Sequence, residues 1–262
     1  MTAPADRLVA TLRERGVADE RVLSAVRSVP RDLFVPAALR DEAWENIPLP
    51  IGCGQTISQP LVVARMCELL ELRGDERVLD VGTGSGYHAA LLAQLAAHVY
   101  SIELHPELSA RAGLCLSAAG VGNVTLVTGD GTLGLPEHAP YDAINVAAAA
   151  SGDVPGALVA QLAGGGRLVA PVDGRDQRLV LVRRIGDRVD ATELERVRFV
   201  PLVHGGRRAV RRSPGRVPDQ RTGLSRSLGR SSRPTFPPGR PSTITTSAVK
   251  SFAPRISEEP TP

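Results

Sequence analysis

The fold is decided by the stretch RVLDVGTGSGY at residues 77–87. A run of branched apolar residues, typical of a buried strand, passes directly into three glycines at alternate positions, and an alanine- and leucine-rich run typical of a helix follows. Glycines in such a loop let the backbone turn sharply and approach a ligand closely. The order strand, loop, helix therefore predicts the first unit of an α/β fold that binds a ligand at the carboxyl end of its strand.

The same alternation of β-branched and Ala/Leu-rich runs continues after this unit. It predicts a Rossmann-like, doubly wound and mostly parallel sheet with helices on both faces. The pattern predicts strands at 77–81, 98–104, 123–129, 141–147, 165–172 and 178–184, and helices at 85–98, 106–120 and 152–166. The segment RFVPL at 198–202 is expected to add a further strand that returns antiparallel.

The N-terminal segment, residues 1–76, is predicted to be a helical extension that also carries the substrate loop. Apolar residues fall at helical spacing in two runs, and Asp19 is a candidate cap for the second run, which Pro30 stops. Phe34, Trp44 and Ile47 are expected to anchor the core. Residues 1–76 and the cofactor-binding core at 77–203 should form one domain of ordinary size.

The charge of the chain divides very unevenly. The 262 residues carry a net charge of +3, but residues 204–262 hold 12 Lys+Arg against 3 Asp+Glu, which leaves 19 against 25 in residues 1–203. This tail is rich in Arg, Pro, Ser and Gly without helical or strand periodicity, so we expect it to be disordered. Its arginines predict weak, salt-sensitive attraction to nucleic acid, and an out-of-frame extension of a GC-rich coding sequence would have the same composition.

Several classes of protein are excluded. The composition, with 42% hydrophobic residues, is that of a folded protein, and no apolar run approaches the roughly 18 residues of a membrane helix. The first residues do not resemble a signal peptide, so no membrane partner and a cytoplasmic location are expected. Three cysteines without a CxxC pair, and histidines without HxH or HExxH spacing, predict small buried thiols and no metal site. No Gly-x-Ser-x-Gly elbow suggests a hydrolase.

Three features at successive strand ends predict the ligand. The loop GTGSG at 82–86 lacks the G-x-G-x-x-G spacing that seats a pyrophosphate, which favours a nucleoside cofactor without one. Glu103 ends the second predicted strand, where a carboxylate can accept hydrogen bonds from both ribose hydroxyls. Asp130, between two glycines after the third strand, suits an exocyclic amine such as that of adenine. Taken singly, each could be an ordinary turn or surface residue.

These motifs resemble a known enzyme family. VLDVGTGSGY with Glu103 and Asp130 is similar to class I S-adenosylmethionine-dependent methyltransferases. A more specific resemblance, to protein-L-isoaspartate O-methyltransferase, extends over roughly residues 5–203 and ends before the tail. It is carried by VPRDLFVP at 29–36, LPIGCGQTISQPLVVARMCELLEL at 49–72, GDG at 129–131, YDAINVAAA at 141–149, GGRLVAPV at 165–172 and RFVPL at 198–202.

The resemblance implies a protein carboxyl methyltransferase of the EC 2.1.1.77 type. Such an enzyme uses S-adenosyl-L-methionine to methylate the free α-carboxylate of L-isoaspartyl residues in damaged proteins, which begins repair through a succinimide. It further implies a monomer whose partners are isoaspartyl-containing proteins and peptides. The implied cofactor-binding residues are Gly82, Thr83, Gly84, Ser85, Gly86, Glu103, Leu104, Asp130 and Gly131. The implied substrate-binding residues are Thr56, Ile57, Ser58, Gln59, Pro60 and Val172, with Ser58 catalytic.

From the residues alone, Ser58 is equally a helix N-cap, because it stands two positions before Pro60. The free N–H groups of such a helix end would themselves favour a carboxylate. The chain departs from the family at His88, where Gln is usual, at Asn145, and at Asp173 in a usual Pro-Val-Gly turn. Two other functions stay open: a methyltransferase for another carboxylate or small molecule, and a silent cofactor-binding module whose basic tail binds nucleic acid.

Overall fold

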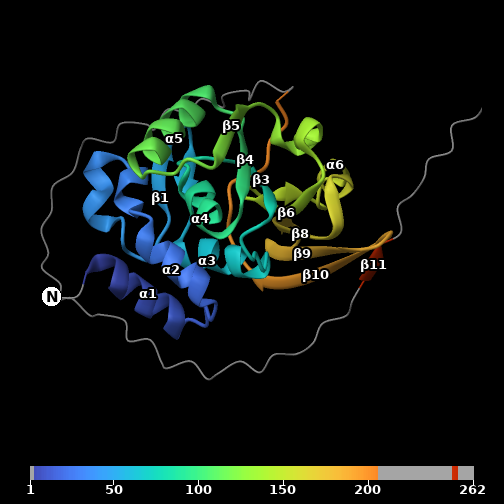
Figure 1. The fold of residues 1–262 in the computed structure, drawn as a ribbon, viewed down its shortest axis with the longest axis horizontal. Helices are drawn as coiled ribbons and strands as arrows, with labels where there is room; N and C mark the ends of the chain where they lie inside the picture. The colour runs from blue at the N-terminus through green and yellow to red at the C-terminus, as the bar shows by residue number, and fades with distance from the viewer. Residues whose placement is uncertain (1–2, 206–249, 253–262) are drawn as a thin grey trace, which may run out of the picture. The chain divides into compact units, whose positions relative to one another are not determined.

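The computed structural model describes residues 3–205 and 250–252 (Figure 1). Within them, nine strands form one sheet of order β11-β10-β9-β8-β6-β3-β4-β5, with β7 paired to β8. The strands are β3 (Arg77–Val81), β4 (His98–Glu103), β5 (Val124–Thr128), β6 (Tyr141–Val146), β7 (Ala150–Ser151), β8 (Leu162–Asp173), β9 (Arg178–Ile185), β10 (Arg188–Arg196) and β11 (Lys250–Phe252). The predicted mostly parallel α/β sheet is confirmed.

The order of the strands fixes where a ligand can bind. β8, β6, β3, β4 and β5 are parallel, and β9 to β11 are antiparallel. The chain passes from β3 outward to β4 and β5 and then returns to β6 on the other side of β3. The direction of winding therefore reverses between β3 and β6, which opens a crevice at the carboxyl ends of these strands.

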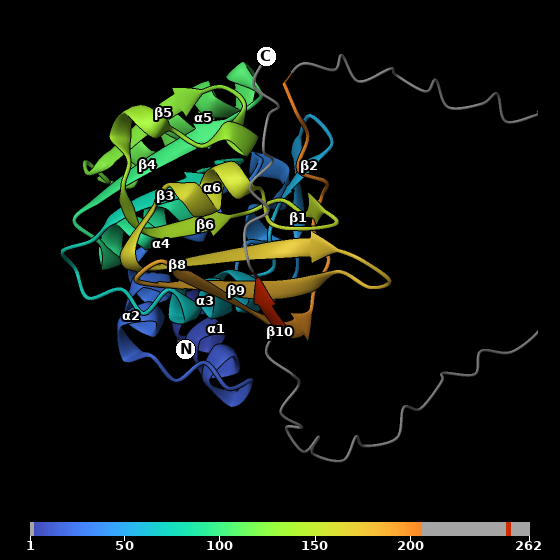
Figure 2. The same cartoon turned by 90° about the vertical axis from the view of Figure 1, so that its right-hand side faces the viewer.

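The helices divide between the two faces of the sheet. One face packs against α1 (Pro4–Glu14), α2 (Glu20–Ser28), α3 (Pro60–Leu69), α4 (Tyr87–Leu95) and α5 (Pro106–Ala118), and the other against the short α6 (Gly156–Ala160). Figure 2 shows α1, α2 and α3 grouped together, apart from α6. Successive residues of β3 alternate between the faces: Val78 belongs to the first core and Leu79 to the second.

The N-terminal segment continues into short elements that reach the carboxyl edge of the sheet. After α2 come the 3-10 turns η1 (Arg31–Phe34) and η2 (Ala37–Glu42), then an antiparallel hairpin of β1 (Leu49–Gly52) and β2 (Gln55–Ile57), and then α3. Two further 3-10 turns, η3 (Gly131–Leu133) and η4 (Pro136–His138), lie between β5 and β6. As predicted, Asp19 caps α2 and Phe34 is fully buried, while Trp44 packs against the core half-buried.

Several expectations about local structure are wrong. The helix expected at 152–166 is confined to Gly156–Ala160, because four residues with three consecutive glycines bulge out of β8 before Arg167 regains its partner on β6. RFVPL forms no strand of the sheet. It makes one isolated parallel bridge, between Pro201 and Ala149, in which the Ala149 N–H donates to the Val200 carbonyl and the Leu202 N–H donates to the Ala149 carbonyl. The antiparallel strands are instead β9, which pairs with β8, and β10, which pairs with β9. The many charged residues of β10 suit an exposed strand.

Two residues that were predicted to be buried, Ile47 and Cys53, are exposed. Ile47 is 41% exposed, although its carbonyl accepts a hydrogen bond from Arg31, so its backbone and not its side chain is held. Cys53 is exposed at the tip of the β1–β2 hairpin, where its φ of 51° is left-handed, while Cys67 is buried and Cys115 half-buried. All three thiols are free.

The tail predicted to be disordered lies mostly outside the described residues, and so do its arginine clusters. Lys250–Phe252 pairs antiparallel with β10, with Ser251 opposite Asp190. In the part of the chain that the structure describes, no helix is long and apolar enough to cross a membrane.

Asp19→Ala should lower the free energy of unfolding by about 1 kcal/mol, as loss of an N-cap typically does. The Asp19 carboxylate accepts from the N–H groups of Arg21, at 2.8 Å, and Val22, at 3.4 Å, at the start of α2. Urea unfolding of the full chain measures the change. Glu14→Ala, which removes an exposed carboxylate, is the control and should change stability by less than about 0.5 kcal/mol. Equal losses in both variants would contradict the assignment.

Candidate active site

Three cavities meet at the carboxyl edge of the parallel strands. We call them the strand-end cavity, lined by Gly82, Gly84, Glu103, Leu104 and Gly131 among others, the inner cavity, and the outer cavity. The inner cavity is lined by Thr56, Ile57, Ser58, Val63, Gly82, Thr83, Gly84, Ser85, Tyr87, His88 and Ala147. The outer cavity has a volume of about 700 Å³ and lies between Ser58, Gln59 and the segment 196–201. Thr56 and Ala147 line all three cavities, so the cavities adjoin one another.

The glycine loop separates the strand-end cavity from the inner cavity. Gly84 has a φ of +55°, which L-residues rarely adopt, and its N–H donates to Glu103 Oε2 at 2.8 Å. Gly86 has a φ of +90° at the N-cap of α4, and a Cβ there would lie 3.2 Å from the Cβ of Ala112 on α5. The positive φ of Gly84 fixes the shape of the loop, and the missing Cβ of Gly86 lets α4 and α5 pack closely.

Glu103 stands at the end of β4 with its carboxylate held by backbone groups. Oε2 accepts from Gly84 and Oε1 accepts from the N–H of His105 at 2.9 Å. The residue is 5% exposed and lines the strand-end cavity together with Leu104. A fixed carboxylate next to an unobstructed glycine backbone fits a ribose with two hydroxyl donors.

Asp130 lies at the end of β5, but its carboxylate is already engaged. Oδ1 accepts from the N–H and the hydroxyl of Thr132, at 2.9 and 2.7 Å, and Oδ2 accepts from the N–H of Gly205 at 2.8 Å. Burial opposes ionisation, yet these hydrogen bonds outweigh it and hold the pKa of Asp130 below its usual value. Gly131, not Asp130, lines the strand-end cavity, and a Cβ there would lie 2.6 Å from Val81 Cγ1.

Ser58 lines both the inner and the outer cavity and does not cap α3. The N-cap of that helix is Gln59, whose side chain makes no capping bond, and the N–H of Leu61 donates to Asn46 Oδ1 at 3.0 Å. The N–H groups of Val62 and Val63 reach the Gln59 carbonyl. The N-cap alternative for Ser58 is therefore wrong, and these N–H groups are not free to bind a carboxylate. The Ser58 hydroxyl is left for a ligand.

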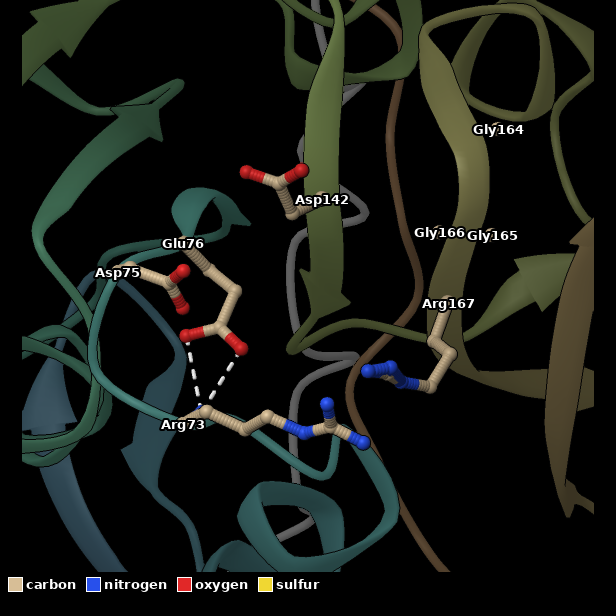
Figure 3. A pocket seen from close by; sticks show the side chains of 8 residues that line it. All are labelled: Arg73, Asp75, Glu76, Asp142, Gly164, Gly165, Gly166 and Arg167. Atoms are coloured by element: carbon tan, nitrogen blue, oxygen red, sulfur yellow. Dashed lines mark hydrogen bonds between the residues drawn. The ribbon is translucent and has the colours of Figure 1, made fainter.

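A different cavity lies at the amino ends of the strands, and its carboxylates have structural roles (Figure 3). It has a volume of about 440 Å³ and is lined by Arg73, Glu76, Asp142, Arg167 and the glycines of the β8 bulge. Glu76 accepts from the N–H of Arg73 at 2.7 and 2.9 Å, and Asp142 accepts from the N–H of Arg77 at 2.9 Å. These carboxylates hold backbone at the amino ends of strands, away from the three cavities. Among the described residues, no cluster of His, Cys, Asp or Glu is arranged to hold a metal ion.

Comparison with known proteins identifies the family. A family model described as "Protein-L-isoaspartate(D-aspartate) O-methyltransferase (PCMT)" matches residues 3–207. The chain is 57% identical over 194 residues to a Protein-L-isoaspartate O-methyltransferase of Methanoculleus marisnigri. The matched segment covers 73% of this chain and 87% of that relative. The chain belongs to the protein-L-isoaspartate O-methyltransferase family. It is thus an S-adenosylmethionine-dependent methyltransferase with protein-L-isoaspartate O-methyltransferase activity.

Solved structures of the family share the fold. A structure of a protein-L-isoaspartate O-methyltransferase superposes with a TM-score of 0.68 at 28% identity, over 77% of this chain and 66% of that one. A structure from Plasmodium falciparum, described as a putative member in complex with S-adenosyl-L-homocysteine, superposes with a TM-score of 0.65 at 24% identity. It covers 75% of this chain and 97% of that one.

The substrate-binding residues that the family resemblance implies do not all lie together. Thr56, Ser58 and Gln59 line the outer cavity and Ile57 lines the inner one, while Pro60 is buried at the start of α3. Val172 on β8 pairs with Ala150 and Arg178 and lines none of the three cavities. Asp173, the departure in the expected turn, still pairs as the last residue of β8, with Ser151 as its partner.

A buried polar network lies beneath the glycine loop, and the sequence analysis missed it. Asp80 is fully buried on β3; its Oδ2 accepts from the Ser101 hydroxyl and its Oδ1 from Asn145 Nδ2, both at 2.7 Å. Burial raises the pKa of Asp80, and the two hydrogen bonds oppose that rise. The Thr83 hydroxyl joins the network 2.6 Å from that of Ser101. An acid in the middle of an apolar strand was the available signal.

Arg31 is a second functional residue that the sequence analysis missed. Its guanidinium is fully buried and donates to the carbonyls of Ala43, Ile47 and Ser58, the last at 3.0 Å. It also lies over the Tyr87 ring, 5.4 Å from the centroid, and burial lowers its pKa to about 10. Arg31 thus joins the N-terminal turns to the backbone of Ser58. The sequence feature that could have indicated its role is a charged residue among the apolar residues and prolines of VPRDLFVP.

Arg31→Met should lower the free energy of unfolding by about 2–3 kcal/mol, because one buried and two partly buried carbonyls lose their donor. It should also reduce methyl transfer more than cofactor binding, since the Ser58 carbonyl loses its support while Glu103 is untouched. Urea unfolding, a cofactor titration and initial rates measure the three quantities. Arg40→Met, at an exposed position of η2, is the control and should change none of them. A stable Arg31→Met variant with unchanged rates would contradict this role.

Proposed function

We propose that the three cavities bind different parts of the reactants. Glu103 binds the ribose of S-adenosylmethionine, and the loop Gly82, Thr83, Gly84, Ser85 and Gly86 lets the sulfur end approach. Leu104 and Gly131 border the base, while Asp130 supports it indirectly by holding the turn that carries Gly131. Ser58 binds the free α-carboxylate of an isoaspartyl residue that enters through the outer cavity. The observation that supports this assignment is that Ser58 lines the inner and outer cavities, while Gly82 and Gly84 line the inner and strand-end cavities.

The chemistry requires no general base. An α-carboxylate with a pKa of about 3.5 is ionised at neutral pH, so it can act directly as the nucleophile. Its oxygen bonds to the methyl group that S-adenosylmethionine supplies, the methyl–sulfur bond breaks with its electron pair left on sulfur, and no proton moves. The task of Ser58 is to hold the carboxylate in line by donating a hydrogen bond, and the walls of the inner cavity exclude water.

The proposed substrate is a short, irregular stretch of a damaged protein. The outer cavity is bordered along one side by the segment 196–201, and its lining combines seven apolar residues with the polar residues Thr56, Ser58, Gln59, Arg196 and Arg198. Such a surface favours recognition of backbone over sequence, which suits an enzyme that repairs many proteins through a succinimide. The residues that line the three cavities all fall within 48–203, which supports an activity that resides in residues 1–203.

The full chain should transfer a labelled methyl group from S-adenosylmethionine to a peptide that contains L-isoaspartate and not to the same peptide with aspartate. The isoaspartyl linkage supplies a free α-carboxylate that the aspartyl peptide lacks. The incorporated label should be labile to base, as a methyl ester is. A panel with other carboxylates and small molecules is the control for specificity. Cofactor binding without transfer to the isoaspartyl peptide would contradict the proposed substrate.

Ser58→Ala and Glu103→Ala should separate catalysis from cofactor binding. Ser58→Ala removes a hydrogen bond to the attacking carboxylate and should reduce kcat by about 10-fold or more, with nearly unchanged affinity for S-adenosylhomocysteine. Glu103→Ala removes the ribose acceptor and should weaken that affinity by about 10-fold or more. Calorimetric titration and initial rates measure both. An equal loss of cofactor affinity in the two variants would show that the roles are wrongly divided.

A further inference from the structure

His88 lines the inner cavity and has a buried polar atom without a hydrogen-bond partner among the described residues. The residue lies in the first turn of α4, directly after the glycine loop, and is 7% exposed. It lines the inner cavity with Ser58 and the loop, and its Nε2 has no hydrogen-bond partner among the described residues. Buried polar atoms are almost always hydrogen-bonded in native proteins. An unpartnered one on the wall of a ligand cavity therefore indicates a contact that the ligand completes.

The network beneath the loop determines which ring nitrogen of His88 carries the proton. Asn145 Nδ2 lies 2.7 Å from Asp80 Oδ1 and 3.2 Å from His88 Nδ1. An amide nitrogen can only donate, so Nδ1 accepts and the hydrogen of the neutral ring is on Nε2. Because Asp80 is fully buried and its other oxygen accepts from Ser101, the Asn145 amide is held in this orientation.

His88 is neutral under ordinary conditions. Burial lowers its pKa from 6.5 to about 3, so the ring does not become an imidazolium at neutral pH. It can therefore supply a hydrogen bond without placing a positive charge next to the sulfonium of the cofactor.

The ligands that reach this cavity bring carboxylates. This step rests on the proposed function. A cofactor whose ribose is bound at Glu103 must pass Gly82 and Gly84, which line both cavities, so its amino-acid end extends into the inner cavity. The isoaspartyl substrate brings its own carboxylate to Ser58 in the same cavity. A hydrogen bond from an N–H to a carboxylate is charge-assisted and stronger than one between neutral groups.

We propose that His88 binds a carboxylate in the inner cavity through its Nε2–H, with Asn145 and Asp80 holding the ring in the donating tautomer. His88 is then a binding residue in addition to Ser58 and Glu103. The carboxylate belongs either to the amino-acid end of the cofactor or to the isoaspartyl residue. One set of variants distinguishes these two sources.

The test compares two thioether nucleosides in the full chain. S-adenosylhomocysteine carries the amino-acid carboxylate, and 5′-methylthioadenosine lacks it. His88→Leu removes the donor at similar volume, His88→Met is a second apolar variant in case the first fails to fold, and His88→Gln keeps an N–H donor. His98→Leu is the control, because His98 on β4 lies outside all three cavities and contacts Thr125. Thermal unfolding verifies that each variant is folded.

If the cofactor supplies the carboxylate, His88→Leu should weaken S-adenosylhomocysteine binding by about 10-fold or more and leave methylthioadenosine binding within about 2-fold. If the substrate supplies it, both nucleosides should bind as before and the KM for the isoaspartyl peptide should rise by a similar factor. In either case His88→Gln should retain most of the affinity or KM that His88→Leu loses, and His98→Leu should behave as the unmodified chain.

Equal weakening of both nucleosides, or no change in either nucleoside affinity or peptide KM, would overturn the proposal. Loss in His88→Gln equal to that in His88→Leu would also overturn it, because a donor would then be irrelevant. The failure of the proposed function is distinguishable. An unmodified chain that binds S-adenosylhomocysteine but methylates no isoaspartyl peptide counts against the substrate assignment, while the nucleoside titrations alone then decide whether His88 binds a carboxylate.

Discussion

The hydrogen bond from the Gly84 N–H to the Glu103 carboxylate holds the site together. It joins the loop after β3 to the end of β4, and it requires the left-handed backbone that Gly84 supplies. With the loop fixed there, the strand-end cavity lies on one side of it and the inner cavity on the other. Glu103 therefore has a structural role in the chain itself before any ribose hydroxyl reaches it.

Arg31, a buried cation in η1, attaches the N-terminal segment to the site. Arg31 holds the Ser58 carbonyl and two carbonyls of the preceding turns, and its guanidinium stacks on Tyr87 in α4. The substrate loop is thus attached both to the N-terminal segment and to the helix that begins at the glycine loop. Apolar residues of the segment 1–76 also belong to the same core cluster as α4 and the sheet, so the segment does not form a separate lobe.

Sequence reasoning recovered the parts of the fold that local pattern determines. The parallel strands, the Asp19 cap and the glycine loop all follow from spacing within a few residues. The short α6 and the strand β10 did not, because the bulge of the glycine run and the edge position of β10 depend on pairing with distant strands. Asp80 and Arg31 were missed, and Asn145 was noted without its partners, for the same reason: each is satisfied by partners 12 to 65 positions away.

The inner cavity differs from the surrounding site in its electrostatics. Its lining contains serine, threonine, tyrosine and a neutral histidine, and none of its lining residues is Asp, Glu, Lys or Arg. Burial raises the pKa of Tyr87 and lowers that of His88, so both stay uncharged. When a carboxylate attacks a sulfonium, two opposite charges partly neutralise each other in the transition state. A fixed charge in the cavity would stabilise one reactant more than the transition state and so slow the reaction. Neutral hydrogen-bond donors position the reactants without that penalty. Arg31 is consistent with this principle, because its charged guanidinium binds the Ser58 carbonyl and does not line the inner cavity.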